Sequence, residues 1–175
     1  MPPPDDVTPI GPVGQIGILV AEIVTALDHY QRIFGVTEWR RYTYGPDFVP
    51  DLWYRGRPTR FSMHIALGGT GPQIELIEPL AAPSIYHEHI DAHGFGVHHL
   101  GVFVASLDEA ITAMTGHGYE LIQYGRGYGL DGDGGFAYFD TSRDHHTIIE
   151  AIEVPRRRPA PLMSWTQPHG GNVPA

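Results

Sequence analysis

Four polar residues of the sequence fit the donor set of a divalent metal site. They are Gln15, Glu75, His99 and Glu150, and each lies in a strand-like segment. Two carboxylates brought together in an apolar interior would repel each other, and one of them would have to take up a proton. A divalent cation removes that cost. Carboxylate and amide oxygens with one imidazole suit Zn, Ni, Co, Mn or Fe(II) better than Mg.

An internal repeat places these four residues at equivalent positions in two halves of the chain. Segment 15–21 aligns with segment 99–105, with Gly, Val and Ala identical and the other apolar positions matched in type. Glu75 and Glu150 occupy the same place in a later strand of each half. Alternate side chains of a strand point to opposite faces, and the apolar neighbours of each polar residue suit a face that packs on a helix. All four polar side chains are therefore expected in one concave face, the cup, around one ion.

The elements that must position these residues follow from periodicity and punctuation. Apolar residues recur at steps of three and four over 23–34, which predicts a helix that Gly35 ends in a left-handed conformation. Ser106 and Glu109 form a capping-box pattern, which predicts the start of a second helix. Three strands bounded by Gly, Pro and Asp are expected after each helix. Their ranges are 37–44, 60–67 and 73–77 in the first half, and 119–124, 135–140 and 147–154 in the second.

Each half therefore predicts a βαβββ module, and the fold class is α+β with a curved mixed sheet. The expected divisions are an N-terminal tail 1–12, a first module 13–80, a linker 81–97, a second module 98–155 and a C-terminal tail 156–175. Both tails are rich in Pro and Gly, so we expect them to be poorly ordered or to lie on the surface. The pattern leaves open whether the cup forms within one chain or across a dimer.

Several histidines outside the set of four also need an interpretation. Alternation along 60–67 places His64 toward the cup, as a second proton-transfer base or as a structural residue bonded to a neighbouring strand. His98 is expected on the helix side, in a structural role. The linker carries Glu88 and three histidines, which are His87, His89 and His93. Their spacing lacks a compact ligand pattern, so we expect exposed loop residues there.

Aromatic residues cluster between the first helix and Glu75. They are Trp39, Tyr42, Tyr44, Phe48, Trp53 and Tyr54. Such residues usually pack a core, but their density beside the cup also suits a flat or apolar substrate. Segment 125–135 is rich in glycine and is expected to form a hairpin loop near the mouth of the cup.

Composition disfavours several classes of function. The chain has 175 residues, which suits one domain or two half-domains that share a core. Its formal net charge of −9 disfavours nucleic acid as a partner, and the three arginines at 156–158 are expected in a solvated tail. No apolar run approaches the roughly 20 residues of a membrane span, and residues 1–12 lack signal-peptide features. The absence of cysteine excludes thiolate ligands and fits a cytoplasmic location.

The paired modules and their four polar positions resemble the vicinal oxygen chelate superfamily of glyoxalases, bleomycin resistance proteins and dioxygenases. Segments 74–80 (IELIEPL) and 94–100 (GFGVHHL), and the hairpin that ends at Glu150, look like the ligand-bearing segments of methylmalonyl-CoA epimerases. The first ligand of such epimerases is usually histidine, whereas Gln15 matches the Gln/Glu/His/Glu set of zinc-type glyoxalase I. The resemblance covers residues 13–154 and is most specific in the second half.

This resemblance implies a metal-dependent enzyme that binds two adjacent substrate oxygens and stabilises an enolate. It also implies a homodimer, and a Glu150 that can leave the metal to carry a proton. We therefore expect an isomerase, epimerase or lyase acting on a small, aromatic or apolar molecule. A ring-cleaving Fe(II) dioxygenase is the alternative, although it needs two histidines where this chain offers Gln15 and His99. A metal-free protein that sequesters small molecules is the third interpretation; such relatives typically lack the ligands.

Overall fold

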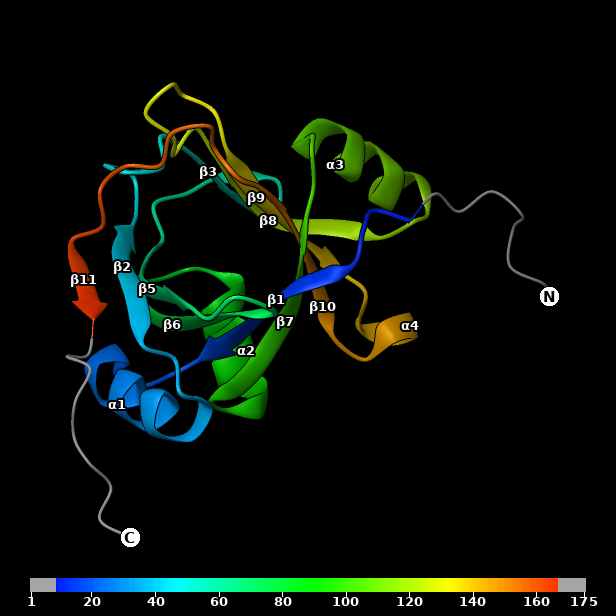
Figure 1. The fold of residues 1–175 in the computed structure, drawn as a ribbon. Coiled ribbons are helices and arrows are strands. Elements are labelled where there is room, and N and C mark those ends of the chain that lie inside the picture. Colours follow the sequence, from blue (N-terminus) through cyan, green and yellow to red (C-terminus); the bar gives the residue numbers. More distant parts are fainter. Residues whose placement is uncertain (1–8, 167–175) are drawn as a thin grey trace, which may run out of the picture.

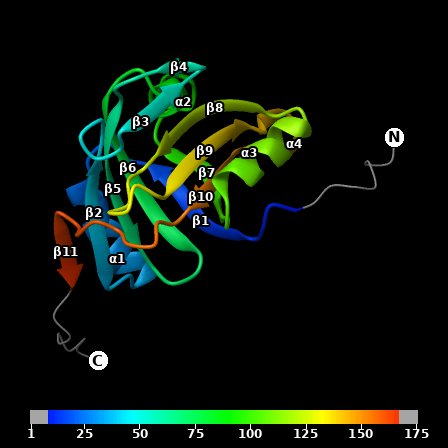
Figure 2. The same ribbon diagram turned by 90° about the horizontal axis from the view of Figure 1, so that it is seen from above.

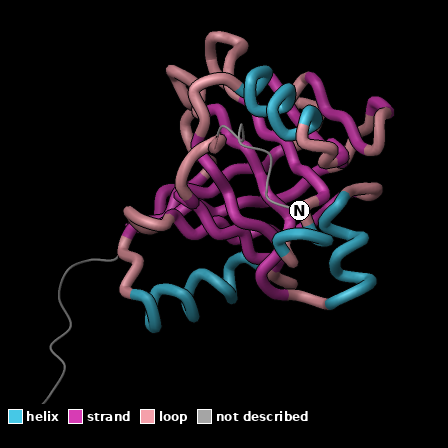
Figure 3. Tube along the Cα trace, turned by 90° about the vertical axis from the view of Figure 1, so that its right-hand side faces the viewer, coloured by secondary structure: helices cyan, strands magenta, loops and turns pink. Residues whose placement is uncertain are grey.

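A computed structural model describes residues 9–166 of the chain. Within these residues, 11 strands form one sheet in the order β11-β2-β5-β6-β1-β7-β10-β9-β8-β3-β4. The sheet curls around its concave face, the cup (Figures 1 and 2). The helices lie at the periphery of the strands (Figure 3). The predicted α+β class with a curved mixed sheet is confirmed.

Each half of the chain contains the predicted βαβββ module. The first consists of β1 (Val13–Leu19), α1 (Ile23–Phe34), β2 (Glu38–Tyr44), β5 (Ser62–Gly68) and β6 (Gln73–Ala81), and it carries an inserted hairpin of β3 (Asp51–Tyr54) and β4 (Arg57–Pro58). The second consists of β7 (Gly96–Phe103), α3 (Leu107–Gly116), β8 (Glu120–Arg126), β9 (Gly135–Asp140) and β10 (Ile148–Glu153), with the short α4 (Ser142–His145) before β10. Two elements lie outside the modules, α2 (Ile85–His93) and β11 (Met163–Thr166).

The two modules meet at the centre of the sheet. β1 and β7 pair in antiparallel register, and each also pairs in parallel with the last strand of its own module, β6 or β10. The first and last strands of each module are therefore neighbours in space, and all four belong to the same chain. Both halves of the cup come from one chain.

Helices α1 and α3 cover the convex face of the sheet. α1 buries Ile23, Ala26 and Leu27 against β5 and β6, while α3 buries Leu107, Ala110 and Met114 against β9 and β10. The predicted ends are also found, because Gly35 has a φ of 64° and the Ser106 hydroxyl accepts a hydrogen bond from the Glu109 amide at 3.2 Å. No helix among the described residues is long and apolar enough to cross a membrane.

Three connections differ from the sequence-based expectation. The linker is not a loop, because α2 occupies most of it. The inserted β3–β4 hairpin leaves its own module and pairs with β8 at the far edge of the sheet. In the predicted C-terminal tail, β11 pairs with β2, so residues 154–162, which we call the strap, run from the second module to the edge of the first (Figure 1, orange). Long-range strand pairing of this kind leaves no periodic signal in the sequence.

Candidate metal centre

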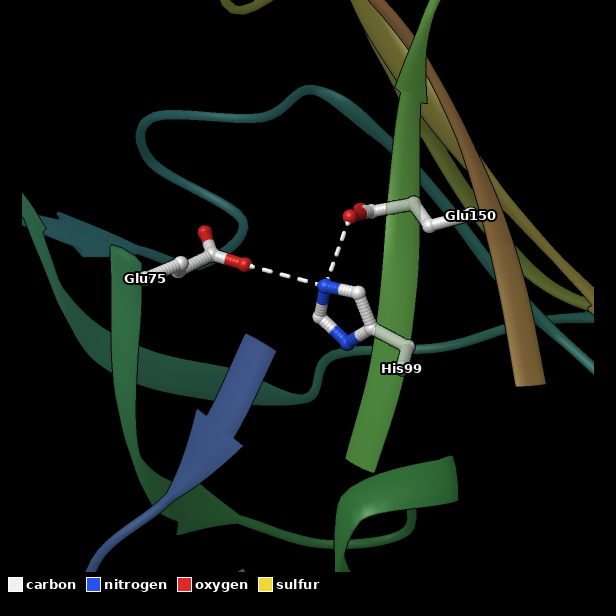
Figure 4. Close-up of side chains that lie close together, drawn as sticks. All are labelled: Glu75, His99 and Glu150. Carbon is white, nitrogen blue, oxygen red and sulfur yellow. Dashed lines mark ion pairs between the residues drawn. The ribbon is translucent and has the colours of Figure 1, made fainter. Parts of the chain in front are cut away.

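Three of the four predicted ligands converge in the cup (Figure 4). Glu75 comes from β6, His99 from β7 and Glu150 from β10. The Nε2 atom of His99 lies 2.9 Å from Glu150 Oε2 and 3.4 Å from Glu75 Oε2. One ligand atom from each residue lies within 4.8 Å of the others, and all three residues are buried. This spacing suits simultaneous contact with a single ion.

The donor atoms of the set lack hydrogen-bond partners. Gln15 Oε1, Glu75 Oε2, His99 Nε2 and Glu150 Oε2 are all buried, and none makes a hydrogen bond within the described part of the chain. The imidazole–carboxylate contacts are close, but they do not have hydrogen-bond geometry. Buried polar groups left unpaired are costly and rare in folded proteins. Four such atoms of metal-binding type in one place fit a divalent cation.

Gln15 lines the same cavity as Glu75 and Glu150. Its amide nitrogen donates a hydrogen bond to Gln73 Oε1 at 3.0 Å, which leaves its own Oε1 as the unpaired atom. The amide is thus oriented with its acceptor available. An amide oxygen is an acceptable ligand for a hard or borderline cation.

Two glycines at the centre of the sheet make room for these side chains. Gly17 of β1 stands opposite His99 on β7 and opposite Glu75 on β6. Gly101 of β7 stands opposite Gln15 on β1 and, on its other side, opposite the glutamate of β10. A Cβ on Gly101 would lie 2.9 Å from Gln15 Oε1. The glycines therefore belong to the site, and their alignment in the repeat has a steric reason.

The charge on the centre depends on an ion or a proton. Although burial by itself lowers the pKa of His99, the Glu150 and Glu75 carboxylates outweigh it and raise that pKa to about 9. Burial raises the pKa of the Glu75 carboxyl, with the repulsion of Glu150 adding to the effect. Without a metal, the centre therefore holds a proton near neutral pH. A cation would take the place of that proton.

His98 supports His99 from behind. The Nδ1 atoms of the two rings lie 3.0 Å apart, and His98 also packs against the rings of Tyr86 and Tyr138. With a metal on Nε2, the Nδ1 atom of His99 would carry the proton of the ring and donate a hydrogen bond to Nδ1 of His98. The prediction that His98 faces the outer helices is wrong. The pairing register shifts between His99 and Val97, and this irregularity turns His98 inward.

His64 does not face the cup. Its neighbours Met63, Ile65 and Leu67 belong to the concave core, whereas Ala66 packs under α1. The His64 ring lies on the outer side and its Nδ1 is 2.8 Å from Thr43 Oγ1 on β2. The predicted orientation is wrong because the cup itself is apolar beside the metal centre, so apolar residues of β5 do not mark its helix face. His64 fits the alternative of a structural residue bonded to the neighbouring strand.

The position of the linker histidines also differs from the expectation. His87, His89 and His93 lie on α2, not in a loop, and His89 packs against His98. His89 and His93, together with His98, line a cavity of about 350 Å³, which is larger than the cavity of the cup. We place the metal centre in the cup nonetheless, because the unpaired donors of the Glu75–His99–Glu150 set lie there.

The walls of the cup are aromatic, but they use only part of the predicted aromatic segment. Tyr44 lines the cavity, joined by Tyr128 and Phe136 from the second module. Trp39 packs under α1 instead, and Trp53 of the β3–β4 hairpin stacks on Tyr124 of β8. Tyr128 belongs to the glycine-rich loop between β8 and β9, which does reach the cup, as predicted. The remaining cavity measures about 30 Å³.

Arg158 of the strap also lines the cup, which the sequence did not indicate. The expectation of a solvated arginine run holds for exposed Arg156 and Arg157, but the Arg158 side chain is half-buried. Its guanidinium lies over the rings of Tyr42 and Tyr128, at 5.6 and 5.5 Å from their centroids. Arg158 reaches the cup because the strap runs from the second module to the edge of the first.

Comparison with known proteins agrees with this architecture. A family model described as the Glyoxalase/Bleomycin resistance protein/Dioxygenase superfamily matches residues 14–139. No curated protein matches the sequence. Among solved structures, a hypothetical protein from Bacillus halodurans C-125 aligns with a TM-score of 0.61 and 22% identity, over 85% of this chain and 97% of that one.

Methylmalonyl-CoA epimerases are also among the similar structures. The Mycobacterium tuberculosis enzyme aligns with a TM-score of 0.58 and 21% identity, over 81% of this chain and 85% of its own. A Streptomyces coelicolor variant bound to 2-nitronate-propionyl-CoA aligns with a TM-score of 0.61 and 13% identity, over 86% of this chain and 99% of its own. At these identities the likeness concerns the fold.

Proposed function

This chain belongs to the glyoxalase/bleomycin resistance protein/dioxygenase superfamily, and on that premise we propose that it is a metal-dependent isomerase, epimerase or lyase. Its substrate is a small molecule with two adjacent oxygens and an acidic C–H bond. The observation that carries the proposal is the set of four buried donor atoms that lie at one place in the cup without a hydrogen-bond partner among the described residues. Gln15, Glu75, His99 and Glu150 would hold one divalent ion.

A divalent ion bound there would stabilise the negative charge that develops on a substrate oxygen when a neighbouring carbon loses its proton. The chain itself must supply a group that takes the proton and returns it. Glu150 is the proposed group, because it is a buried carboxylate that lines the cavity. Glu150 is only 3% exposed, so its carboxylate is shielded from bulk water and the proton would be returned to the substrate and not lost.

The similar structures support this class of reaction. Epimerases with this fold act on methylmalonyl-CoA by name, and an epimerase must break and remake a C–H bond. The aromatic walls formed by Tyr44, Tyr128 and Phe136 favour a substrate with an apolar or aromatic group. The homodimer and the cytoplasmic location stay predictions.

Hydrogen exchange in heavy water tests the reaction type directly. Purified protein of measured metal content would be incubated under nitrogen with methylmalonyl-CoA, methylglyoxal–glutathione adduct and phenylpyruvate, and deuterium incorporation followed by mass spectrometry. We expect exchange in at least one compound, and loss of exchange by about 10²–10⁴-fold in Glu150→Gln. His64→Gln is the matched control and should exchange at the wild-type rate.

Two outcomes would favour the other interpretations. Turnover that requires oxygen gas and Fe(II), with no exchange under nitrogen, would identify a dioxygenase. Protein that binds apolar compounds but holds no metal would identify a sequestering protein.

A further inference from the structure

The strap holds Arg158 over the metal centre through contacts with the glycine-rich loop. The Arg157 carbonyl accepts a hydrogen bond from the Leu130 amide at 2.9 Å. The Arg156 amide and guanidinium donate to Asp133 at 2.9 and 3.0 Å, and Arg157 forms an ion pair with Asp131. Each exposed pair contributes little alone, but together they fix the residues before Arg158 in one place. The third arginine is thereby directed into the cup.

Arg158 has unused hydrogen-bonding capacity in that position. Its guanidinium lies over two tyrosine rings, and its one polar contact within residues 9–166 is a long one, from Nη1 to Tyr44 Oη at 3.5 Å. It forms no ion pair with any residue that the structure describes. A guanidinium carries five N–H donors arranged for a carboxylate. Most of these donors are therefore available to a ligand.

The charges in the cup favour an anion. The carboxylates of Glu75 and Glu150 balance a divalent ion, and Arg158 is the only cationic side chain among the described residues that line the cavity. The loaded site would then carry one net positive charge next to apolar walls. A single negative charge on the substrate would neutralise it in a region shielded from water, where charge-assisted hydrogen bonds are strong.

We propose that Arg158 is a specificity-determining residue that binds a carboxylate of the substrate, which makes the substrate class small organic acids with an apolar or aromatic remainder. This proposal rests on the proposed function, because it names the substrate of the same site. The substrate carboxylate would lie between Arg158 and the metal centre, next to the substrate oxygens that face the metal ligands. Tyr44, Tyr128 and Phe136 would contact the remainder.

The size of the cavity adds a condition. A space of about 30 Å³ holds one or two water molecules, less than any such acid requires. Arg158 must therefore shift when the acid enters, and its place over the tyrosine rings is the ligand-free position. The ties of Arg156 and Arg157 to the loop allow the end of the side chain to move while its backbone stays in place.

Binding of matched charged and neutral ligands tests this role. Phenylpyruvate and its methyl ester share a skeleton and two adjacent oxygens but differ in charge. Calorimetric titrations would compare wild type, Arg158→Gln and the control Arg32→Gln, each with metal and after chelation. We expect wild type to prefer the acid, and Arg158→Gln to weaken acid binding by about 10- to 100-fold while sparing the ester. Arg32→Gln removes the same charge from an exposed position on α1, outside the strap and the cavity, and should keep the preference.

The outcomes separate this proposal from the metal assignment. An unchanged ratio of acid to ester affinity in Arg158→Gln would overturn the role of Arg158, as would tighter binding of both ligands, which would show that the side chain merely blocks the cup. Absence of metal, or affinities unaffected by chelation, would contradict the proposed function instead. Arg158→Lys keeps the charge without the planar fork, and should retain part of the preference.

Discussion

Gly17 lies opposite His99 in the β1–β7 ladder, so close that a Cβ atom on Gly17 would be 1.8 Å from the Cε1 atom of the imidazole. No side chain fits in that space while the ring keeps its place. The metal centre thus depends on a residue that has no ligand atom. Gly101 stands in the corresponding relation to Gln15, so both central strands of the repeat share this arrangement.

The first prediction follows from this contact. Gly17→Ala should displace the His99 ring, reduce bound metal and lower the free energy of unfolding by about 1–3 kcal/mol, as overpacking does in other cores. Thermal unfolding and metal analysis of the same sample would measure both effects. Gly116→Ala is the control, because nothing lies within 4 Å of a Cβ at that helical position. Normal metal content in Gly17→Ala would contradict the assigned position of His99.

The second prediction concerns the pH dependence of the metal-free protein. The folded-state pKa of His99 is raised to about 9 from an ordinary value of 6.5, and that of Glu75 is raised as well. A raised folded pKa stabilises below the unfolded pKa, and the stabilisation disappears as pH rises through the folded pKa. Chelated protein should therefore lose stability between pH 6.5 and 9, as measured by urea unfolding.

Metal should reverse this trend over the same interval. Binding displaces the proton on His99, so metal affinity should rise with pH up to about 9. Titrations of metal in buffers with different heats of ionisation would reveal the released proton. In His99→Gln both pH trends should largely disappear. A flat stability profile for chelated wild-type protein would show that His99 is not coupled to the carboxylates.

The third prediction separates the aromatic residues of the cup from those outside it. Trp53 stacks on Tyr124 at a centroid distance of 5.9 Å and donates to Asp51, away from the cavity. Trp53→Phe should therefore leave ligand affinity unchanged and alter stability only. Tyr128→Ala removes a wall of the cup and should weaken binding of phenylpyruvate without reducing metal content. Equal losses of affinity in both variants would contradict this division.

The sequence predicted the modules and the ligand set because both rest on short-range periodicity. In β1, β6, β7 and β10 an apolar face under a helix alternates with a face that carries a predicted ligand, so the orientation of Glu75 and Glu150 could be predicted from their neighbours. In strand β5 the apolar face of Met63, Ile65 and Leu67 packs inside the cup and not under a helix, so alternation assigned His64 to the wrong side.

Other features depend on tertiary contacts, which the alternation of polar and apolar residues does not predict. A register irregularity turns His98 toward Tyr138, and strand pairing distant in sequence brings Arg158 over the cup. The sequence of the linker predicts a loop because α2 has a weak apolar stripe, and only Ile85 and Tyr86 among its residues are buried. The residues that complete the cup thus come from tertiary contacts, beyond the reach of local pattern.

Metal stoichiometry is the most direct test of the metal centre. Wild-type protein, loaded with Zn, Ni, Co, Mn or Fe(II) in turn and then desalted, would be analysed by inductively coupled plasma mass spectrometry beside Glu75→Gln and His99→Ala. The control is His89→Ala, which alters a histidine of α2 outside the ligand set. We expect one ion per chain in wild type and in the control, with clear losses in Glu75→Gln and His99→Ala. Full occupancy in both ligand variants, or no metal in wild type, would contradict the assignment of the cup as a metal centre.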